Sequence, residues 1–284
     1  VECGEITLPE DRSVPSGAKV VLPVVVVRAA KPASDLPPVF YFHGGPGGSV
    51  VSDVAFALEA PEWKDLIGVR QDWIFFDQRG SGRARPYLGC PGQPVTDAGP
   101  ASPEAALALQ ACLQEHTGRG VDLSHYNSIE VVRDLHDLRT ALGVETFDLY
   151  ALSYGTRVAF DLILHAPEGL RAAVLDSPWP LEASWTEPGP VWVSEALQRV
   201  LTLCREDTEC RAKYPEVGDK FDAILRSWLE AAPADADARH RVGRAAVWIM
   251  ESLYDPDAVE ALPSNLWRLV NGDDAVLMNY ELLE

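Results

Sequence analysis

Short apolar runs alternate with amphipathic segments along the first 178 residues of the chain. The runs are rich in β-branched and aromatic residues and are bounded by turn residues, which is typical of buried strands. This pattern predicts strands at 5–8, 19–28, 39–43, 73–77, 146–151 and 170–176.

The clearest helix is predicted between Ile129 and Leu142. Apolar residues recur there at the spacing of helical turns, which places them on one face of the helix. They are Ile129, Val132, Leu135, Leu138 and Leu142. Asn127 and Glu130 form an expected capping pair at the start, and Gly143 ends the helix. Further helices are expected over 103–116 and 154–166.

Strands and helices that alternate in this way are typical of a parallel sheet with crossover helices, so we expect an α/β core over 1–178. After Pro178 the pattern changes, and no convincing strand returns. Helices are expected at 191–203, 220–231, 239–253 and 257–270. We interpret 179–284 as a helical cap over the carboxyl edge of a sheet that lacks its last strands.

Ser153 lies between a predicted strand and a predicted helix, in the run Leu-Tyr-Ala-Leu-Ser-Tyr-Gly over 149–155. A sharp turn at this place exposes the serine hydroxyl and crowds both neighbours, which favours small residues two positions before and after it. Ala151 and Gly155 meet this need, although the usual pattern has glycine at the first of them. The run therefore predicts a nucleophile elbow.

A glycine-rich loop, His-Gly-Gly-Pro-Gly-Gly over 43–48, directly follows a predicted strand. Backbone N–H groups in such a loop can stabilise the oxyanion of an acyl-transfer reaction. We expect the N–H groups of Gly45 and Tyr154 to be the donors. A phosphate cradle or a plain turn is the alternative, but the loop lacks the Gly-Lys-Ser/Thr ending of a phosphate cradle.

Asp77 begins the run Asp-Gln-Arg-Gly-Ser-Gly over 77–82, at the end of a predicted strand. A catalytic carboxylate could stand at this edge of the sheet. We favour a structural role instead, in which an Asp–Arg pair braces the loops around the elbow. Asp176 also closes a strand beside this edge, and the same two roles are open to it.

These motifs, in this order and at this spacing, resemble the prolyl iminopeptidase and tripeptidyl aminopeptidase family of α/β-hydrolases. The resemblance covers about residues 1–215 and includes Cys3-Gly4, 174–178 and the loop between Cys204 and Cys210. It implies an α/β-hydrolase fold and cleavage of short N-terminal segments from peptides. Ser153 would attack the scissile carbonyl, and the cap would restrict access to peptide ends.

A serine nucleophile needs a general base and an acid that orients it, and in this fold both follow the serine along the chain. Histidines occur at 43, 116, 125, 136, 165 and 240. His165 is expected at the far end of the helix after Ser153, and His240 in the cap. We expect none of the six to be the base. The interpretation is a fragment whose acid and base lie beyond Glu284, with little or no turnover of its own.

The composition bears on partners and on the cellular compartment. The formal net charge of −19 argues against nucleic acid as a partner. No apolar stretch is long enough to predict a membrane span. Cys204 and Cys210 flank a short polar loop, Cys90 and Cys112 bracket a Pro/Gly-rich connection, and Cys3 is left over, although spacing alone does not decide the pairing. We favour a secreted or periplasmic protein with two disulfides, from which any signal peptide has been removed.

The cap holds candidate substrate-binding residues. Six of the eight tryptophans lie there: Trp179, Trp185, Trp192, Trp228, Trp248 and Trp267. Trp179 and Trp185 could line an apolar pocket, or could simply pack cap helices. Glu182, and with it Glu187 and Glu195, could bind a peptide's free amine, or could be solvated surface.

We expect a peptide or small ester as substrate, without a cofactor or a metal, since no Cys/His cluster suggests zinc. The alternatives are a carboxylic-ester hydrolase of the same fold and a non-catalytic binding module. The sequence does not decide the oligomeric state.

Overall fold

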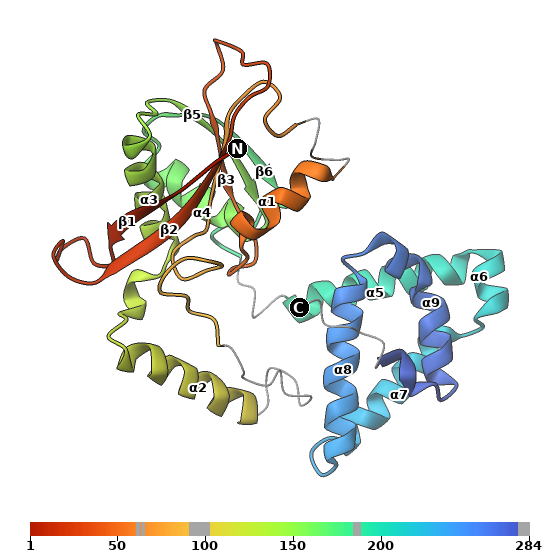
Figure 1. Ribbon diagram of the computed structural model, residues 1–284. Helices are drawn as coiled ribbons and strands as arrows, with labels where there is room; N and C mark the ends of the chain where they lie inside the picture. Colours follow the sequence, from red (N-terminus) through yellow and green to blue (C-terminus); the bar gives the residue numbers. More distant parts are fainter. Residues whose placement is uncertain (61–62, 64–65, 91–102, 184–188, 278–284) are drawn as a thin grey trace. The chain divides into compact units, whose positions relative to one another are not determined.

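The computed structural model describes the chain except for residues 61–62, 64–65, 91–102, 184–188 and 278–284. It divides into two compact units (Figure 1). The first comprises Val1–Pro91 with Cys112–Ala183, and the second comprises Gly92–Ala111 with Ser184–Glu284. The boundary expected at Pro178 stays a prediction, as does the role of the second unit as a cap.

The first unit is built on a six-stranded sheet with the order β1-β2-β4-β3-β5-β6 in the described part of the chain. All six predicted strands are present. Their bounds are β1 (Glu2–Pro9), β2 (Lys19–Val27), β3 (Val39–Phe42), β4 (Trp73–Phe76), β5 (Phe147–Leu152) and β6 (Leu170–Asp176). β4, β3, β5 and β6 are parallel, whereas β2 pairs antiparallel with both β1 and β4.

The strand order reverses at β3, because the chain passes from β3 to β4 on one side and then returns to β5 on the other. Right-handed crossovers in opposite directions place their helices on opposite faces of the sheet. α1 (Val50–Glu59) packs on one face, and α3 (Ser128–Ala141) and α4 (Tyr154–His165) pack on the other (Figure 1). The loops after β3 and β5 therefore leave the sheet side by side.

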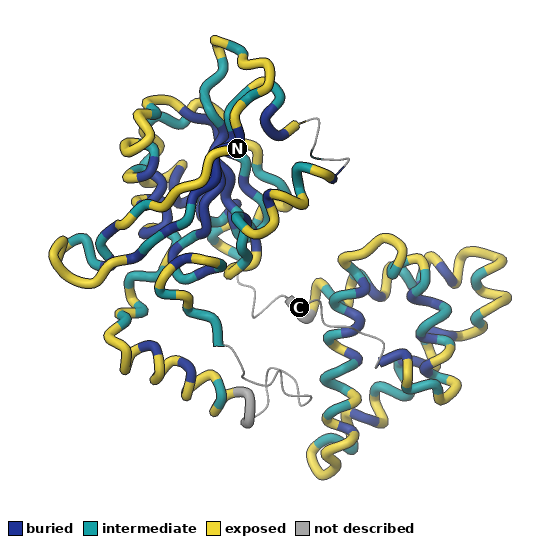
Figure 2. Tube along the Cα trace, in the orientation of Figure 1, coloured by how far each residue is buried: buried dark blue, intermediate teal, exposed yellow. Residues whose placement is uncertain are grey.

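The strands and the inner sides of α3 and α4 form the main core, which the buried colouring of Figure 2 follows. Of the five apolar residues predicted on one face of α3, Val132, Leu135 and Leu138 are buried, whereas Ile129 and Leu142 are 47% and 43% exposed. Val131 is buried in place of Ile129, together with the carboxylates of Glu130 and Asp134. Asn127 caps the helix as expected by accepting a hydrogen bond from the backbone N–H of Glu130.

Arginines explain why two carboxylates of α3 are buried. Arg79 makes a bidentate pair with Asp134, with both N–O distances at 2.7 Å and both side chains fully buried. Arg12 also binds Glu130 and Asp134. Charged groups tolerate burial when they are paired in this way.

The second unit is helical in its described residues, as expected. Its helices are α5 (Gly189–Glu206), α6 (Thr208–Lys213), α7 (Val217–Ala231), α8 (Ala236–Ser252) and α9 (Pro256–Val270), followed by the short η2 (Asp274–Leu277). They enclose a core of their own that includes Phe221, Trp228 and Trp248. These two tryptophans therefore pack helices of the second unit together. α2 (Pro103–Gly118) and the short η1 (Leu123–His125) precede α3.

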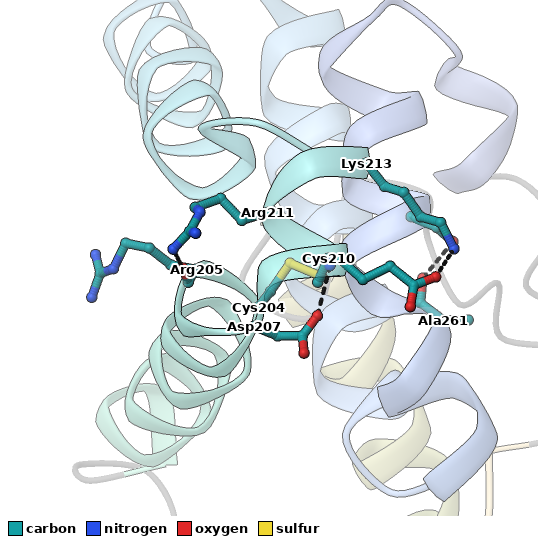
Figure 3. Close-up of a disulfide and its surroundings, with 9 residues drawn as sticks. Cys204, Arg205, Asp207, Cys210, Arg211, Lys213 and Ala261 are labelled. Atoms are coloured by element: carbon teal, nitrogen blue, oxygen red, sulfur yellow. Dashed lines mark hydrogen bonds and ion pairs between the residues drawn. A yellow bond between two sulfur atoms is a disulfide. The ribbon is translucent and has the colours of Figure 1, made fainter.

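Two disulfides join the cysteine pairs Cys90–Cys112 and Cys204–Cys210, and Cys3 is free and exposed. Figure 3 shows the second disulfide across the turn from α5 to α6. Asp207 caps α6 within that turn, and its carboxylate lies 2.7 Å from the backbone nitrogen of Cys210. None of the helices that the structure describes has both the length and the apolar character needed to cross a membrane.

Candidate active site

Ser153 lies in the sharp turn between β5 and α4, with φ 53° and ψ −119°. A residue other than glycine is strained at these backbone angles, and it keeps them only where the surrounding structure holds it in place. The backbone N–H of Ser153 donates to the carbonyl of Asp176 at 2.8 Å, which ties the turn to the end of β6. The structure thus gives this serine the geometry of a nucleophile elbow.

The need for small residues on either side of the elbow is visible in the packing. A Cβ atom at Gly155 would lie 2.2 Å from the carbonyl oxygen of Phe42, the last residue of β3. Ala151 is fully buried in the core and pairs with Phe42 across the sheet. Close approach between β3 and the start of α4 therefore requires glycine at 155.

The loop over 43–48 lies directly against the elbow. A Cβ atom at Gly44 would be 3.1 Å from Cβ of Ser153 and 3.6 Å from its Oγ. Gly45 has φ +112°, which favours glycine. Tyr154 begins α4, so its N–H has no acceptor within the helix. The structure brings the loop of Gly45 and the N–H of Tyr154 to one serine; their role as oxyanion donors stays a prediction.

His43 braces this loop through packing. A Cβ atom at Gly48 would lie 2.3 Å from Cδ2 of the His43 ring, so the ring occupies the space that glycine leaves free. Gln78 donates to the carbonyl of His43 at 3.1 Å. Burial lowers the pKa of the His43 imidazole, which favours its neutral form.

The Asp77 carboxylate has a structural role, but its partners are not the expected ones. Its carboxylate accepts the backbone N–H of Val51 at 3.0 Å, the hydroxyl of Ser49 at 2.9 Å and the backbone N–H of Arg83 at 2.8 Å. The expected Asp–Arg side-chain pair is therefore wrong at this position. Asp77 instead joins the end of β4 to the start of α1, and Arg79 pairs with Asp134.

Asp176 closes β6 beside the elbow, as its place in the sequence predicts. The hydroxyl of Tyr150 donates to its carboxylate at 2.7 Å, and Ser177 donates to the other oxygen at 3.1 Å. Burial, and next the hydrogen bond to Asp176, raise the pKa of Tyr150 to about 12. Asp176 therefore contributes to the elbow through its backbone carbonyl.

The structure records no hydrogen bond between Ser153 and any of the six histidines, all of which lie in its described residues. Four of them contact other groups of the first unit. His116 lies 3.3 Å from the carbonyl of Gly89, and His136 lies 2.9 Å from that of Ala166. His125 faces Asp11 and Asp122, and His165 faces Asp161. His240 belongs to α8 in the second unit.

The candidate substrate-binding residues differ in burial and in their contacts. Trp179 is half-buried in the first unit, and its ring lies edge-on to that of Tyr154 at 6.1 Å between centroids. Glu182 is exposed. Trp185 lies outside the described residues. Among those residues, no three His, Cys, Asp or Glu side chains are grouped as a metal site would need.

Sequence reasoning missed two residues of the first turn of α4, Thr156 and Arg157. Thr156 is fully buried and bonds both Ser153 and Trp179. Arg157 donates to the carbonyls of Pro180, Leu181 and Ala183. Their position just after the elbow is the only signal in the sequence, because their partners from Trp179 onward lie more than twenty residues away.

The family described as alpha/beta hydrolase fold matches residues 37–212, which include the elbow and the glycine-rich loop. The chain belongs to this family. It is 26% identical over 186 residues to serine protease Hip1 of Mycobacterium tuberculosis, covering 61% of this chain and 35% of that protein. It is 27% identical over 189 residues to tripeptidyl aminopeptidase of Streptomyces coelicolor, covering 62% and 35%. The expected resemblance to tripeptidyl aminopeptidases is thereby confirmed.

The chain spans about a third of the length of these curated relatives. Among solved structures, a proline iminopeptidase of Mycobacterium smegmatis is 19% identical, with a TM-score of 0.47. That match covers 96% of this chain and 70% of the other.

Proposed function

We propose that the protein is an exported serine peptidase that releases short N-terminal segments from peptides, with Ser153 as its nucleophile. The observation that carries the proposal is the strained elbow of Ser153 beneath the glycine-rich loop over 43–48. Similarity to a serine protease and a tripeptidyl aminopeptidase supports peptides as the substrate class. The two disulfides support export.

In the proposed reaction, Oγ of Ser153 attacks the scissile carbonyl carbon while a base takes its proton. The carbonyl oxygen becomes an oxyanion that accepts hydrogen bonds from the N–H groups of Gly45 and Tyr154. Collapse of the tetrahedral intermediate breaks the C–N bond, and the leaving amine takes the proton. Water then hydrolyses the acyl-enzyme by the same steps and regenerates the serine.

We place the acid and the base outside these 284 residues. Two observations support this. None of the histidines in the described residues is bonded to Ser153, and β6 lies at the end of the strand order with Val174 54% exposed. An open parallel edge of this kind can pair with further strands. The 284-residue chain alone would then show little or no turnover.

Trp179 is our candidate for an apolar wall of the substrate site, because its ring packs on Tyr154 next to the nucleophile. Glu182 follows three residues later and is exposed, so its carboxylate is available to bind the free amine of a peptide. Trp185 completes the set proposed for substrate binding.

The test is labelling by a fluorophosphonate probe, which reacts with activated serines, in protein expressed from the complete reading frame around these residues. We expect labelling that Ser153→Ala abolishes. Ser177→Ala is a matched control, because Ser177 also follows a strand and has positive φ, at 54°. It should label as the parent does.

Each outcome of the labelling experiment bears on the proposal. Labelling that survives Ser153→Ala, or a parent that does not label, would contradict the proposal, and the second result would favour a binding module. Paired assays on aminoacyl amides and simple esters separate a peptidase from a carboxylic-ester hydrolase.

A further inference from the structure

Thr156 binds the carbonyl oxygen of Ser153 through two hydrogen bonds. This oxygen accepts the backbone N–H of Thr156 at 2.9 Å and the Thr156 hydroxyl at 2.6 Å. The Thr156 side chain has no exposed surface. The Thr156 hydroxyl therefore makes this bond from a buried position.

The direction of the Thr156 hydroxyl proton follows from its second partner. The backbone N–H of Trp179 lies 2.7 Å from Oγ1 of Thr156, and a backbone N–H can only donate. Oγ1 must accept that bond, so its own proton is left for the carbonyl of Ser153. The three groups form a chain with one polarity, from Trp179 N–H through the Thr156 hydroxyl to the Ser153 carbonyl.

The donor end of this chain is itself anchored to α4. Arg157 holds the segment after Trp179 through the carbonyls of Pro180 and Leu181, each at 3.1 Å. Its guanidinium also lies 5.3 Å from the centroid of the Trp179 ring. The N–H of Trp179 is therefore fixed relative to the same helical turn that carries Thr156.

Peptide geometry connects this chain to the proposed oxyanion site. The carbonyl of Ser153 and the N–H of Tyr154 belong to one planar, trans peptide unit, so they point in opposite directions. A bond that fixes the direction of the carbonyl therefore also fixes the direction of the N–H, on the opposite side of the peptide unit. Donors to an oxyanion act through their preset direction, because no reorganisation is then needed during the reaction.

We propose that Thr156 is a positioning residue that aims the N–H of Tyr154 at the oxyanion by holding the carbonyl of the Ser153–Tyr154 peptide. This inference rests on the proposed function, since it gives the peptide unit a task only in a serine hydrolase. The specific requirement is for the hydroxyl of Thr156, beyond the volume of its side chain.

The test compares Thr156→Val, which keeps the shape and loses the hydroxyl, with Thr156→Ser, which keeps the hydroxyl. Both are made in the complete reading frame, and acylation by a chromogenic ester is measured per site titrated with the fluorophosphonate probe. Loss of one oxyanion donor typically costs about 100- to 1,000-fold in kcat. We expect Thr156→Val to lower kcat by at least about 10-fold at little change in KM, and Thr156→Ser to stay within about 3-fold of the parent.

Thr140→Val is the matched control, because the Thr140 hydroxyl also donates to a backbone carbonyl, that of His136 at 2.8 Å, on another helix. It should leave kcat unchanged. If Thr156→Val does not fold, Thr156→Ala against Thr156→Ser isolates the hydroxyl, because both lack the methyl group. Ala should then be the slower of the two.

The outcomes separate this inference from the proposed function. A parent that neither labels nor acylates would contradict the serine-hydrolase proposal and this inference with it. An active parent with unchanged kcat in Thr156→Val would overturn this inference alone. Equal losses in the Val and Ser variants, or in the Ala and Ser variants, would also overturn it, because they would indicate packing.

Discussion

At the scale of single residues, the elbow depends on two positions. At one of them a side chain has no room, and at the other the backbone has an unusual conformation. The carbonyl of Phe42 leaves no space for a side chain at Gly155, and Ser153 has a positive φ. The sequence pattern identified both positions through the spacing of small residues around the serine. Conformational strain at such a site needs compensation from the surrounding packing.

Replacing Gly155 by alanine tests how tight this contact is. The new Cβ would lie 2.2 Å from the carbonyl oxygen of Phe42, so β3 and α4 would have to separate. We expect Gly155→Ala to lower the free energy of unfolding by about 1–3 kcal/mol and to slow labelling of Ser153. Urea denaturation and probe labelling measure the two effects.

Gly118→Ala is the control for that substitution, because a Cβ at Gly118 would meet nothing within 4 Å. Its stability should stay within about 0.5 kcal/mol of the parent. Equal stability of the Gly155→Ala variant and the parent would show that β3 and α4 do not touch as described.

At the scale of elements, a buried charge pair adds to the apolar contacts that hold α3 against the sheet. α3 meets the loop after β4 through Arg79 and Asp134, both without exposed side-chain surface. Removal of Arg79 would leave the buried charge of Asp134 with Arg12 as its remaining partner, and an undercompensated charge in the interior is destabilising. This pair therefore sets the position of α3 beside the loop that carries Asp77 and Gln78.

Arg79→Met is expected to destabilise the protein by about 3 kcal/mol, because the buried Asp134 would lose its bidentate partner and keep only its contact with Arg12. Arg133→Met is a useful comparison. Arg133 also binds a buried carboxylate of α3, Glu130, but its own side chain is 55% exposed. We expect a loss of about 1 kcal/mol or less there. Urea denaturation measures the free energy of unfolding of both variants. Similar losses in the two would contradict the claim that burial makes the Arg79–Asp134 pair the more important one.

At the scale of the whole molecule, the chain has two compact units with separate cores. The Cys204–Cys210 disulfide belongs to the helical unit, and Ser153 belongs to the other. A disulfide that closes so short a loop stabilises a fold by about 2 kcal/mol. Its effect should be confined to the unit that contains it.

The double variant Cys204→Ser/Cys210→Ser tests this independence. We expect a lower melting temperature for the helical unit in calorimetry and an unchanged rate of Ser153 labelling per titrated site. Cys3→Ser should alter neither, because Cys3 is exposed and free. A large change in the labelling rate of the double variant would show that the helical unit controls the nucleophile.

Much of the fold was predictable because strands and helices leave a local signature. The apolar runs located all six strands, and the small residues around Ser153 located the turn after β5. The glycine-rich run predicted the loop that lies against that serine. Periodicity and turn chemistry act within a few residues, so the sequence by itself determined these features.

Only the tertiary structure decided which distant groups meet. The burial of Asp134 depends on Arg79, 55 residues before it, and the hydroxyl of Thr156 depends on Trp179, 23 residues after it. Asp77 was expected to bind an arginine side chain and instead binds the backbone N–H groups of Val51 and Arg83. Such partners are set by the strand order, which brings the ends of β3, β4, β5 and β6 to one edge, and local periodicity carries no information about that order.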